Sequence, residues 1–147
     1  RLLATPCMRS IKELMPKFIK YRVIPVLLLG FTAPVHAGEM DGKGLECTFV
    51  ENPLNFGPKY YLFENGKVVQ PYVDDSTPLS IKRETYQDDY EATASTIVWS
   101  TSYTFDRKTL KLSVSMGMET QKYYCQVMTP EDIESILQKQ IEVFKEE

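Results

Sequence analysis

Apolar and polar residues alternate in short runs along most of the chain, and this pattern constrains the fold more than any other feature. In residues 110–118 every second side chain is aliphatic, and in residues 96–105 most odd positions are apolar or aromatic. Successive side chains of a β-strand point to opposite faces of a sheet, so such runs predict half-buried strands. The four residues between the two runs, 106–109, complete a predicted β-hairpin.

The same pattern predicts a mainly β fold for residues 44–128. Seven strands are expected, at residues 44–50, 59–64, 67–73, 79–87, 96–105, 110–118 and 121–128. Asn65-Gly66 is a favoured two-residue hairpin turn. Pro71 cannot donate to a ladder, which places its strand at an edge or ends its pairing early. Seven short antiparallel strands predict a small β-sandwich or a partly open barrel.

The periodicity changes at Thr129 to that of a helix. Thr129 is a good N-cap, and Pro130 suits the first helical position. The apolar residues that follow lie on one stripe of a helix over about residues 130–145: Ile133, Ile136, Leu137, Ile141 and Phe144. We expect this helix to lie on the sheet or to cover its open edge.

Residues 8–37 are typical of a secretory signal peptide. A basic segment precedes the apolar residues 23–31, and small residues lead to a cleavage point between Ala37 and Gly38. Nine apolar residues are too few for a stable membrane span, which takes about 20. An uncleaved amphipathic anchor is the alternative. Translation from Met8 or Met15 would make residues 1–7 an upstream extension or a fragment scar.

Export would leave residues 38–147 as a single domain. The only histidine, His36, would be removed with the leader. Cys47 and Cys125 would enter an oxidising compartment, where one disulfide between them is expected and a free reactive thiol is the alternative. Each cysteine lies on the face of its predicted strand that should point inward, with Val127 on the same face as Cys125, so we expect the bond to tie the two ends of the sheet together. The predicted localisation is therefore periplasmic or secreted.

Residues 38–147 carry 11 Lys and Arg against 19 Asp and Glu, a formal net charge of −8. An acidic domain repels phosphate backbones and anionic membrane surfaces, so neither is an expected partner. Without histidine, this part of the chain cannot form a Ser-His-Asp triad or a Cys-His pair. The sequence therefore indicates no catalytic, cofactor-binding or metal-binding residues.

Clustered carboxylates are the remaining candidates for chemistry. Asp88, Asp89 and Glu91, with Glu84 nearby, could act as an acid and base pair or bind a cation. Adjacent aspartates are also ordinary turn formers, and we favour that interpretation here and at Asp74-Asp75.

Aromatic side chains are the candidates for a contact surface. Trp99 shares its predicted face with Ile97 and Phe105, which favours a place in the core. The rings of Tyr60 and Tyr61 must point to opposite sides of a strand, as must those of Tyr124 and its neighbour. Tyr124 and one of Tyr60 or Tyr61 are therefore the possible contact residues, but we favour the alternative that these rings shield a sheet face or the C-terminal helix.

The layout resembles a family of small exported bacterial proteins that has no assigned activity. The matching segments are residues 42–47, 63–68, Trp99, 106–112 and 124–127. A looser similarity is to the periplasmic inhibitors of c-type lysozyme, small β-domains whose first and last strands are disulfide-linked. Those inhibitors present a Ser-Gly-x-x-Tyr loop, whereas the corresponding residues 91–102 contain no glycine.

The favoured hypothesis is a non-enzymatic binding module of the bacterial envelope that recognises a protein, peptide or glycan. A carboxylate-dependent glycan hydrolase or a lysozyme-inhibitor-like protein is one alternative. A structural or stress-protective envelope protein is another. No cofactor is implied by any of the three.

Overall fold

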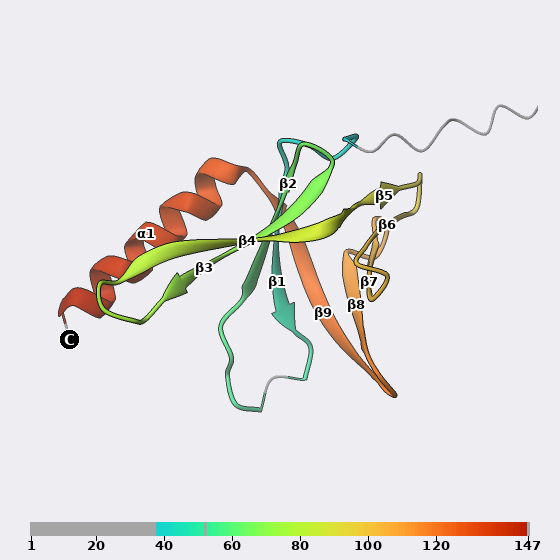
Figure 1. Ribbon diagram of the computed structural model, residues 1–147. Helices are drawn as coiled ribbons and strands as arrows, with labels where there is room; N and C mark the ends of the chain where they lie inside the picture. Colours follow the sequence, from blue (N-terminus) through green and yellow to red (C-terminus); the bar gives the residue numbers. More distant parts are fainter. Residues whose placement is uncertain (1–37, 52, 147) are drawn as a thin grey trace, which may run out of the picture. The chain divides into compact units, whose positions relative to one another are not determined.

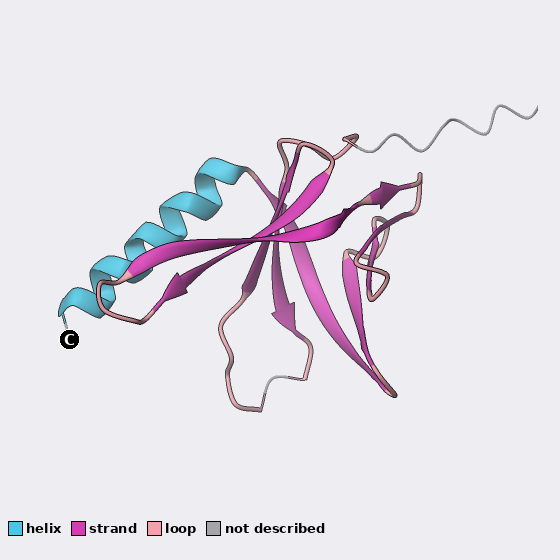
Figure 2. Ribbon diagram, viewed as in Figure 1, coloured by secondary structure: helices cyan, strands magenta, loops and turns pink. Residues whose placement is uncertain are grey.

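A computed structural model describes residues 38–51 and 53–146. The predicted extension at residues 1–7 and the predicted signal peptide at residues 8–37 lie outside the described residues. The described chain forms nine strands and one helix (Figures 1 and 2). These are β1 (Gly44–Phe49), β2 (Lys59–Glu64), β3 (Lys67–Asp74), β4 (Ser80–Asp89), β5 (Glu91–Ala92), β6 (Thr96–Trp99), β7 (Tyr103–Asp106), β8 (Lys111–Met116), β9 (Glu119–Met128) and α1 (Pro130–Glu146).

All nine strands belong to one antiparallel sheet in the order β4-β3-β2-β1-β9-β8-β7-β6-β5. The two edge strands, β4 and β5, are consecutive in the chain and are separated by Tyr90 alone. Figure 1 shows β4 running directly into β5. The sheet therefore curls into a nearly closed barrel. The predicted mainly β class and C-terminal helix are confirmed.

Tyr90 lies at the point where the two edges of the sheet meet. Its backbone N–H donates to the carbonyl of Gly66 at 3.0 Å, and its hydroxyl accepts from the N–H of Met40 at 2.8 Å. The same hydroxyl donates to Asp41 Oδ1 at 3.0 Å. The ring packs edge-on against Phe63, with the centroids 5.0 Å apart. One buried tyrosine thus connects both edges with the residues that precede β1.

The barrel interior is filled by aromatic and aliphatic side chains. Leu45 and Cys47 of β1 point inward, as do Tyr123 and Cys125 of β9, which confirms the faces predicted for these strands. Trp99 is only 1 % exposed, so its predicted place in the core is also confirmed. Its ring stacks on that of Tyr103, with the centroids 5.2 Å apart. Burying these rings is a major favourable contribution to folding.

Helix α1 packs on the outside of the barrel and buries a second apolar cluster with β2 and β3. Ile133 and Leu137 pack there with Tyr60, Leu62 and Val69. The predicted cap is confirmed, since the N–H of Asp132 donates to Thr129 Oγ1 at 3.2 Å.

Two residues of the helix and of the strand before it are more exposed than predicted. Phe144, expected on the buried stripe, is half exposed in the last turn. Val127 was expected on the buried face of its strand but is also half exposed. Among the residues that the structure describes, no helix is both long and apolar enough to span a membrane.

The disulfide between Cys47 and Cys125 is present. These residues are direct partners in the register of β1 and β9, with Cα atoms 4.0 Å apart. The first and last strands of the chain are neighbours in the middle of the sheet. The bond therefore links the central strand β9 to its neighbour β1, and the expectation that it joins the ends of the sheet is wrong.

Three expectations about strands are corrected. The run 96–105 is two strands, β6 and β7, because a turn at Ser100 and Thr101 interrupts it. β5 is a further short strand, so the described part of the chain forms nine strands and not seven. Strand β3, which contains Pro71, is not an edge strand, since β4 pairs with it on one side. Its pairing with β2 does end early, at Val69.

Candidate functional site

The predicted contact tyrosines lie in three different environments. Tyr124 is 52 % exposed on the outer face of β9, as expected. Tyr60 and Tyr61 are 4 % and 1 % exposed, so the expectation that one of them faces solvent is wrong. The ring of Tyr60 lies in the cluster beneath α1, and that of Tyr61 lies inside the barrel, 5.3 Å from Trp99. Both faces of β2 are covered at this point.

The carboxylates considered for catalysis or cation binding are spread over β4 and β5. Glu84 and Asp88 are four residues apart on β4, which in an extended strand corresponds to about 13 Å. Glycosidase carboxylates are about 5 to 9.5 Å apart. Asp89 instead forms an exposed ion pair with Lys67, with the charged atoms 2.8 Å apart.

The expected turn functions of the aspartate pairs are only partly observed. Asp88 and Asp89 lie within β4, so the turn expected there is wrong. Asp74 does have the expected function, since its Oδ1 accepts from the N–H of Ser76 at 3.0 Å. In the described part of the chain, no three His, Cys, Asp or Glu side chains are grouped to hold a metal ion.

The hairpin formed by β8 and β9 extends beyond the end of the barrel. Leu112 and Val114 are buried, but Met116 is largely exposed and Met118 is fully exposed, although all four have the same alternation. The partner strands end earlier, because β7 begins opposite Val114 and β1 ends opposite Tyr123. The tip of the hairpin therefore has no sheet neighbour to cover its apolar side chains.

The β1–β2 loop projects from the same end of the sheet. β1 runs antiparallel to β9, so the end of β1 lies beside the start of β9, and Figure 1 shows the loop and the hairpin tip on the same side. The loop exposes Val50, Leu54 and Phe56. We call the five exposed apolar residues the end surface: Val50, Leu54, Phe56, Met116 and Met118.

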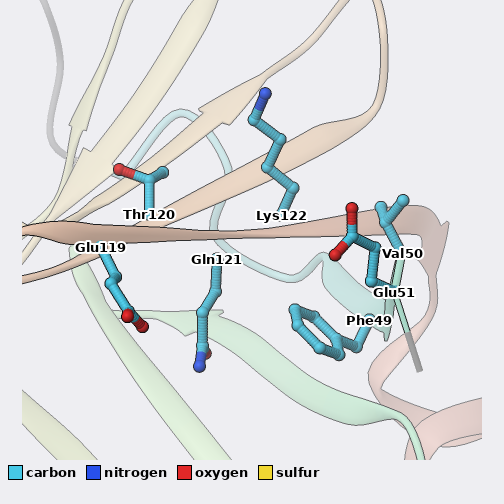
Figure 3. Close-up of a pocket in the computed structure, with 7 residues that line it drawn as sticks. All are labelled: Phe49, Val50, Glu51, Glu119, Thr120, Gln121 and Lys122. Carbon is cyan, nitrogen blue, oxygen red and sulfur yellow. The ribbon is translucent and has the colours of Figure 1, made fainter. Parts of the chain in front are cut away.

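A cleft of about 480 Å³ lies between the start of the loop and the start of β9. Its lining residues are Phe49, Val50, Glu51, Glu119, Thr120, Gln121 and Lys122. Figure 3 shows Phe49, Glu119 and Gln121 on one side of the β9 ribbon and Thr120 and Lys122 on the other. The cleft thus has an aromatic group, two carboxylates, one ammonium and one amide around it.

Internal contacts hold parts of this cleft in place. The ring of Phe49 lies 5.2 Å from that of Tyr123, measured between centroids. The hydroxyl of Tyr123 donates to Gln121 Oε1 at 2.9 Å, and the N–H of Val50 donates to the carbonyl of Lys122 at 2.9 Å. An apolar group bound here would find walls that are already ordered, which lowers the entropic cost of binding.

The sequence did not identify the end surface. Its residues continue patterns that predict burial or lie in a loop that contains Pro and Asn, and only the strand order brings them to one end. Exposed apolar residues at one end of the sheet, beside a cleft lined mainly by polar residues, have the composition of a protein contact site. No family model, curated protein or solved structure matches the chain.

Proposed function

We propose that the protein is a non-enzymatic binding module exported to the bacterial envelope, and that its end surface contacts a partner protein or peptide. The observation that carries this proposal is the exposure of five apolar side chains on two projections from the same end of the sheet; one of the five, Val50, also lines the cleft. Exposed apolar groups of this kind are costly in water and are covered when a partner binds.

The chemistry of the described residues favours binding over catalysis. They contain no histidine, and their two cysteines are joined in a disulfide. The carboxylates proposed for hydrolysis are dispersed along β4 and β5. The barrel interior is occupied by side chains, so a ligand would bind on the outside.

Methionine suits such a surface because its flexible side chain adapts to different apolar partners. Phe56 and Leu54 would supply larger anchors from the loop. We expect the polar residues at the cleft, Glu119 and Lys122, to form the rim of the contact and to contribute less to affinity.

Site-specific photo-crosslinking tests the proposal. A photoreactive amino acid is placed at Met118 in the full chain, which is then expressed in cells that export it. We expect one defined adduct, and we expect Phe56→Ser to weaken its formation about tenfold because an apolar anchor is lost.

Two matched controls use exposed residues away from the end surface. Val143 on α1 is 59 % exposed, the same fraction as Phe56, and Val143→Ser should leave the adduct unchanged. A photoreactive group at Val127 should not give the adduct. An adduct that forms equally from Val127, or one that Phe56→Ser leaves intact, would count against the proposal.

A further inference from the structure

Strand β9 continues past the end of its neighbour β1, and the part that continues is an open sheet edge. The last residues of the two strands in register are Phe49 and Tyr123. One further bond follows, from the N–H of Val50 to the carbonyl of Lys122 at 2.9 Å. On its other side β9 pairs with β8 as far as its first residue, Glu119. Within the described residues, the first three residues of β9 therefore have a strand neighbour on one side only.

Thr120 directs its backbone groups toward the open side. In an antiparallel ladder, the N–H and C=O of one residue point to one neighbouring strand, and those of the next residue point to the other. The N–H of Cys125 donates to the carbonyl of Leu110, just before β8, whereas the carbonyl of Lys122 accepts from Val50. Odd residues of β9 therefore face β8, and even residues face β1. The N–H and C=O of Thr120 thus point past the end of β1, and neither has a hydrogen-bond partner in the described part of the chain.

The cleft of about 480 Å³ borders this edge. Val50 and Glu51, which follow β1, line one part of it, and Glu119–Lys122 of β9 line another. Figure 3 shows Phe49 on one side of the β9 ribbon and the side chain of Thr120 on the other. The space beside Thr120 is therefore open at the position where the ladder would otherwise continue, and it has side chains above and below it.

The groups left free at this edge select the kind of molecule that can occupy it. A donor and an acceptor on one residue of an open edge are complementary to the acceptor and donor of another extended backbone. A helix does not match them, because its own N–H and C=O groups bond to one another. Two copies of this chain could also pair here, but residues 38–147 of each carry a net charge of −8, and like charges disfavour that contact. The edge therefore favours an extended segment of a different protein.

We propose that a partner protein contributes an extended segment that pairs with β9 at Thr120, in line with β1, and so adds a strand to the sheet. This rests on the proposed function, because it specifies how the partner at the end surface is held. Met116 is directly opposite Glu119, and Figure 3 shows Glu119 on the same side of β9 as Phe49. Every second side chain of the segment would lie on the face that carries Phe49 and Met116, so we expect apolar residues at those positions.

Amide hydrogen exchange of the native protein, followed by NMR, tests the edge in the absence of a partner. We expect the N–H of Thr120 to exchange at least about tenfold faster than that of Gln121, which points to β8. The two residues are adjacent at the same end of the sheet, so they form a matched pair. A Thr120 N–H as protected as that of Gln121 would show that the edge is already paired, within one chain or between two copies, and would overturn the proposal.

A proline variant tests strand addition in the crosslinking assay with the photoreactive group at Met118. Thr120→Pro removes the N–H at the open edge but no bond to β8, a position at which a strand tolerates proline. We expect this variant to weaken the adduct about tenfold. Thr120→Val keeps the N–H and should leave the adduct unchanged. The urea midpoint shows whether Thr120→Pro folds, and the exchange measurement on the native protein is decisive even if it does not.

The outcomes separate strand addition from the proposed function. An adduct that Phe56→Ser weakens but Thr120→Pro leaves unchanged would keep the end surface as a contact site and overturn strand addition. An equal loss with Thr120→Val and Thr120→Pro would assign the contact to the side chain and would also overturn it. No adduct from the chain with native residues at these positions would count against both proposals.

Discussion

Gly44 lies where β1 packs against α1, and it allows a quantitative test of the fold. A Cβ atom added to Gly44 would lie 2.4 Å from Ile133 Cδ1, 3.1 Å from Leu62 Cδ2 and 3.3 Å from the carbonyl oxygen of Tyr61. The first of these distances is about 1 Å shorter than an ordinary contact. Ile133 is fully buried, so its Cδ1 atom has little free space into which it can move.

We therefore expect Gly44→Ala to lower the free energy of unfolding. Overpacking a core typically costs about 1–3 kcal/mol. Replacing glycine also restricts the unfolded chain, which offsets about 0.4–1 kcal/mol of that cost. A net loss of about 1–2 kcal/mol should appear as a lower urea midpoint. Trp99, the only tryptophan of the chain, reports unfolding by its fluorescence.

A double-mutant cycle identifies the cause. Ile133→Val removes the Cδ1 atom and alone should cost about 0.5–1.5 kcal/mol. In Gly44→Ala/Ile133→Val the shortest contact is gone, so the two losses should not add, and we expect a favourable coupling of about 1 kcal/mol. Gly57→Ala is the control, because no atom lies within 4 Å of a Cβ at that position. Additive losses in the double variant would refute the close-packing argument.

Two further predictions concern the disulfide and the buried tyrosines. The Cys47–Cys125 disulfide joins residues 78 positions apart in the sequence. Its reduction should lower the free energy of unfolding by up to about 4.5 kcal/mol in the chain-entropy model. An unchanged denaturation midpoint would contradict this prediction. Burial, with a contribution from Glu46, raises the pKa of Tyr60 from 10.0 to about 12, and burial likewise raises that of Tyr90 to about 12. Because folding raises these pKa values, the contribution of the two neutral tyrosines to stability should be complete below pH 10 and should be lost toward about pH 12. Tyrosinate absorbance should therefore rise together with unfolding. Full ionisation of all tyrosines near pH 10 while the protein stays folded would refute the raised pKa values.

Much of the fold follows from local patterns in the sequence. The alternation in β1 and β9 identified the inward face, and with it the inward direction of Cys47 and Cys125. The turn at Asn65-Gly66 was predicted from two residues that adopt positive φ angles of 52° and 75°. In each case a short-range steric or hydrophobic rule is sufficient, because the tertiary structure agrees with it.

The turn between β6 and β7 shows where such rules fail. Ser100 and Thr101 have φ angles of 49° and 51°, yet neither is a residue that usually adopts this conformation. The alternation of apolar residues continues across the turn, since Trp99 and Tyr103 are directly paired. The pattern therefore gave no sign of the reversal. Pairing within the barrel decides the conformation here and overrides local preference.

The environment of Tyr60 also depends on information that local patterns do not contain. A strand with polar residues on one face and apolar residues on the other has a recognisable alternation, but Lys59–Glu64 is covered by the core on one face and by α1 on the other. Period-two reasoning assigns one tyrosine of the adjacent pair to solvent. Only the docking of a helix more than 60 residues later in the chain excludes this.

The end surface depends most strongly on topology. Val114, Met116 and Met118 occupy equivalent positions of one alternating run, yet the first is buried and the last is fully exposed. The difference is set by where the neighbouring strands β7 and β1 stop, and that in turn depends on the β6–β7 turn and on the length of the β1–β2 loop. Extending β1 along Gln121 and Glu119 would cover the hairpin and close the cleft. A strand pattern that continues past its neighbours therefore places apolar side chains in solvent, where a binding partner can reach them.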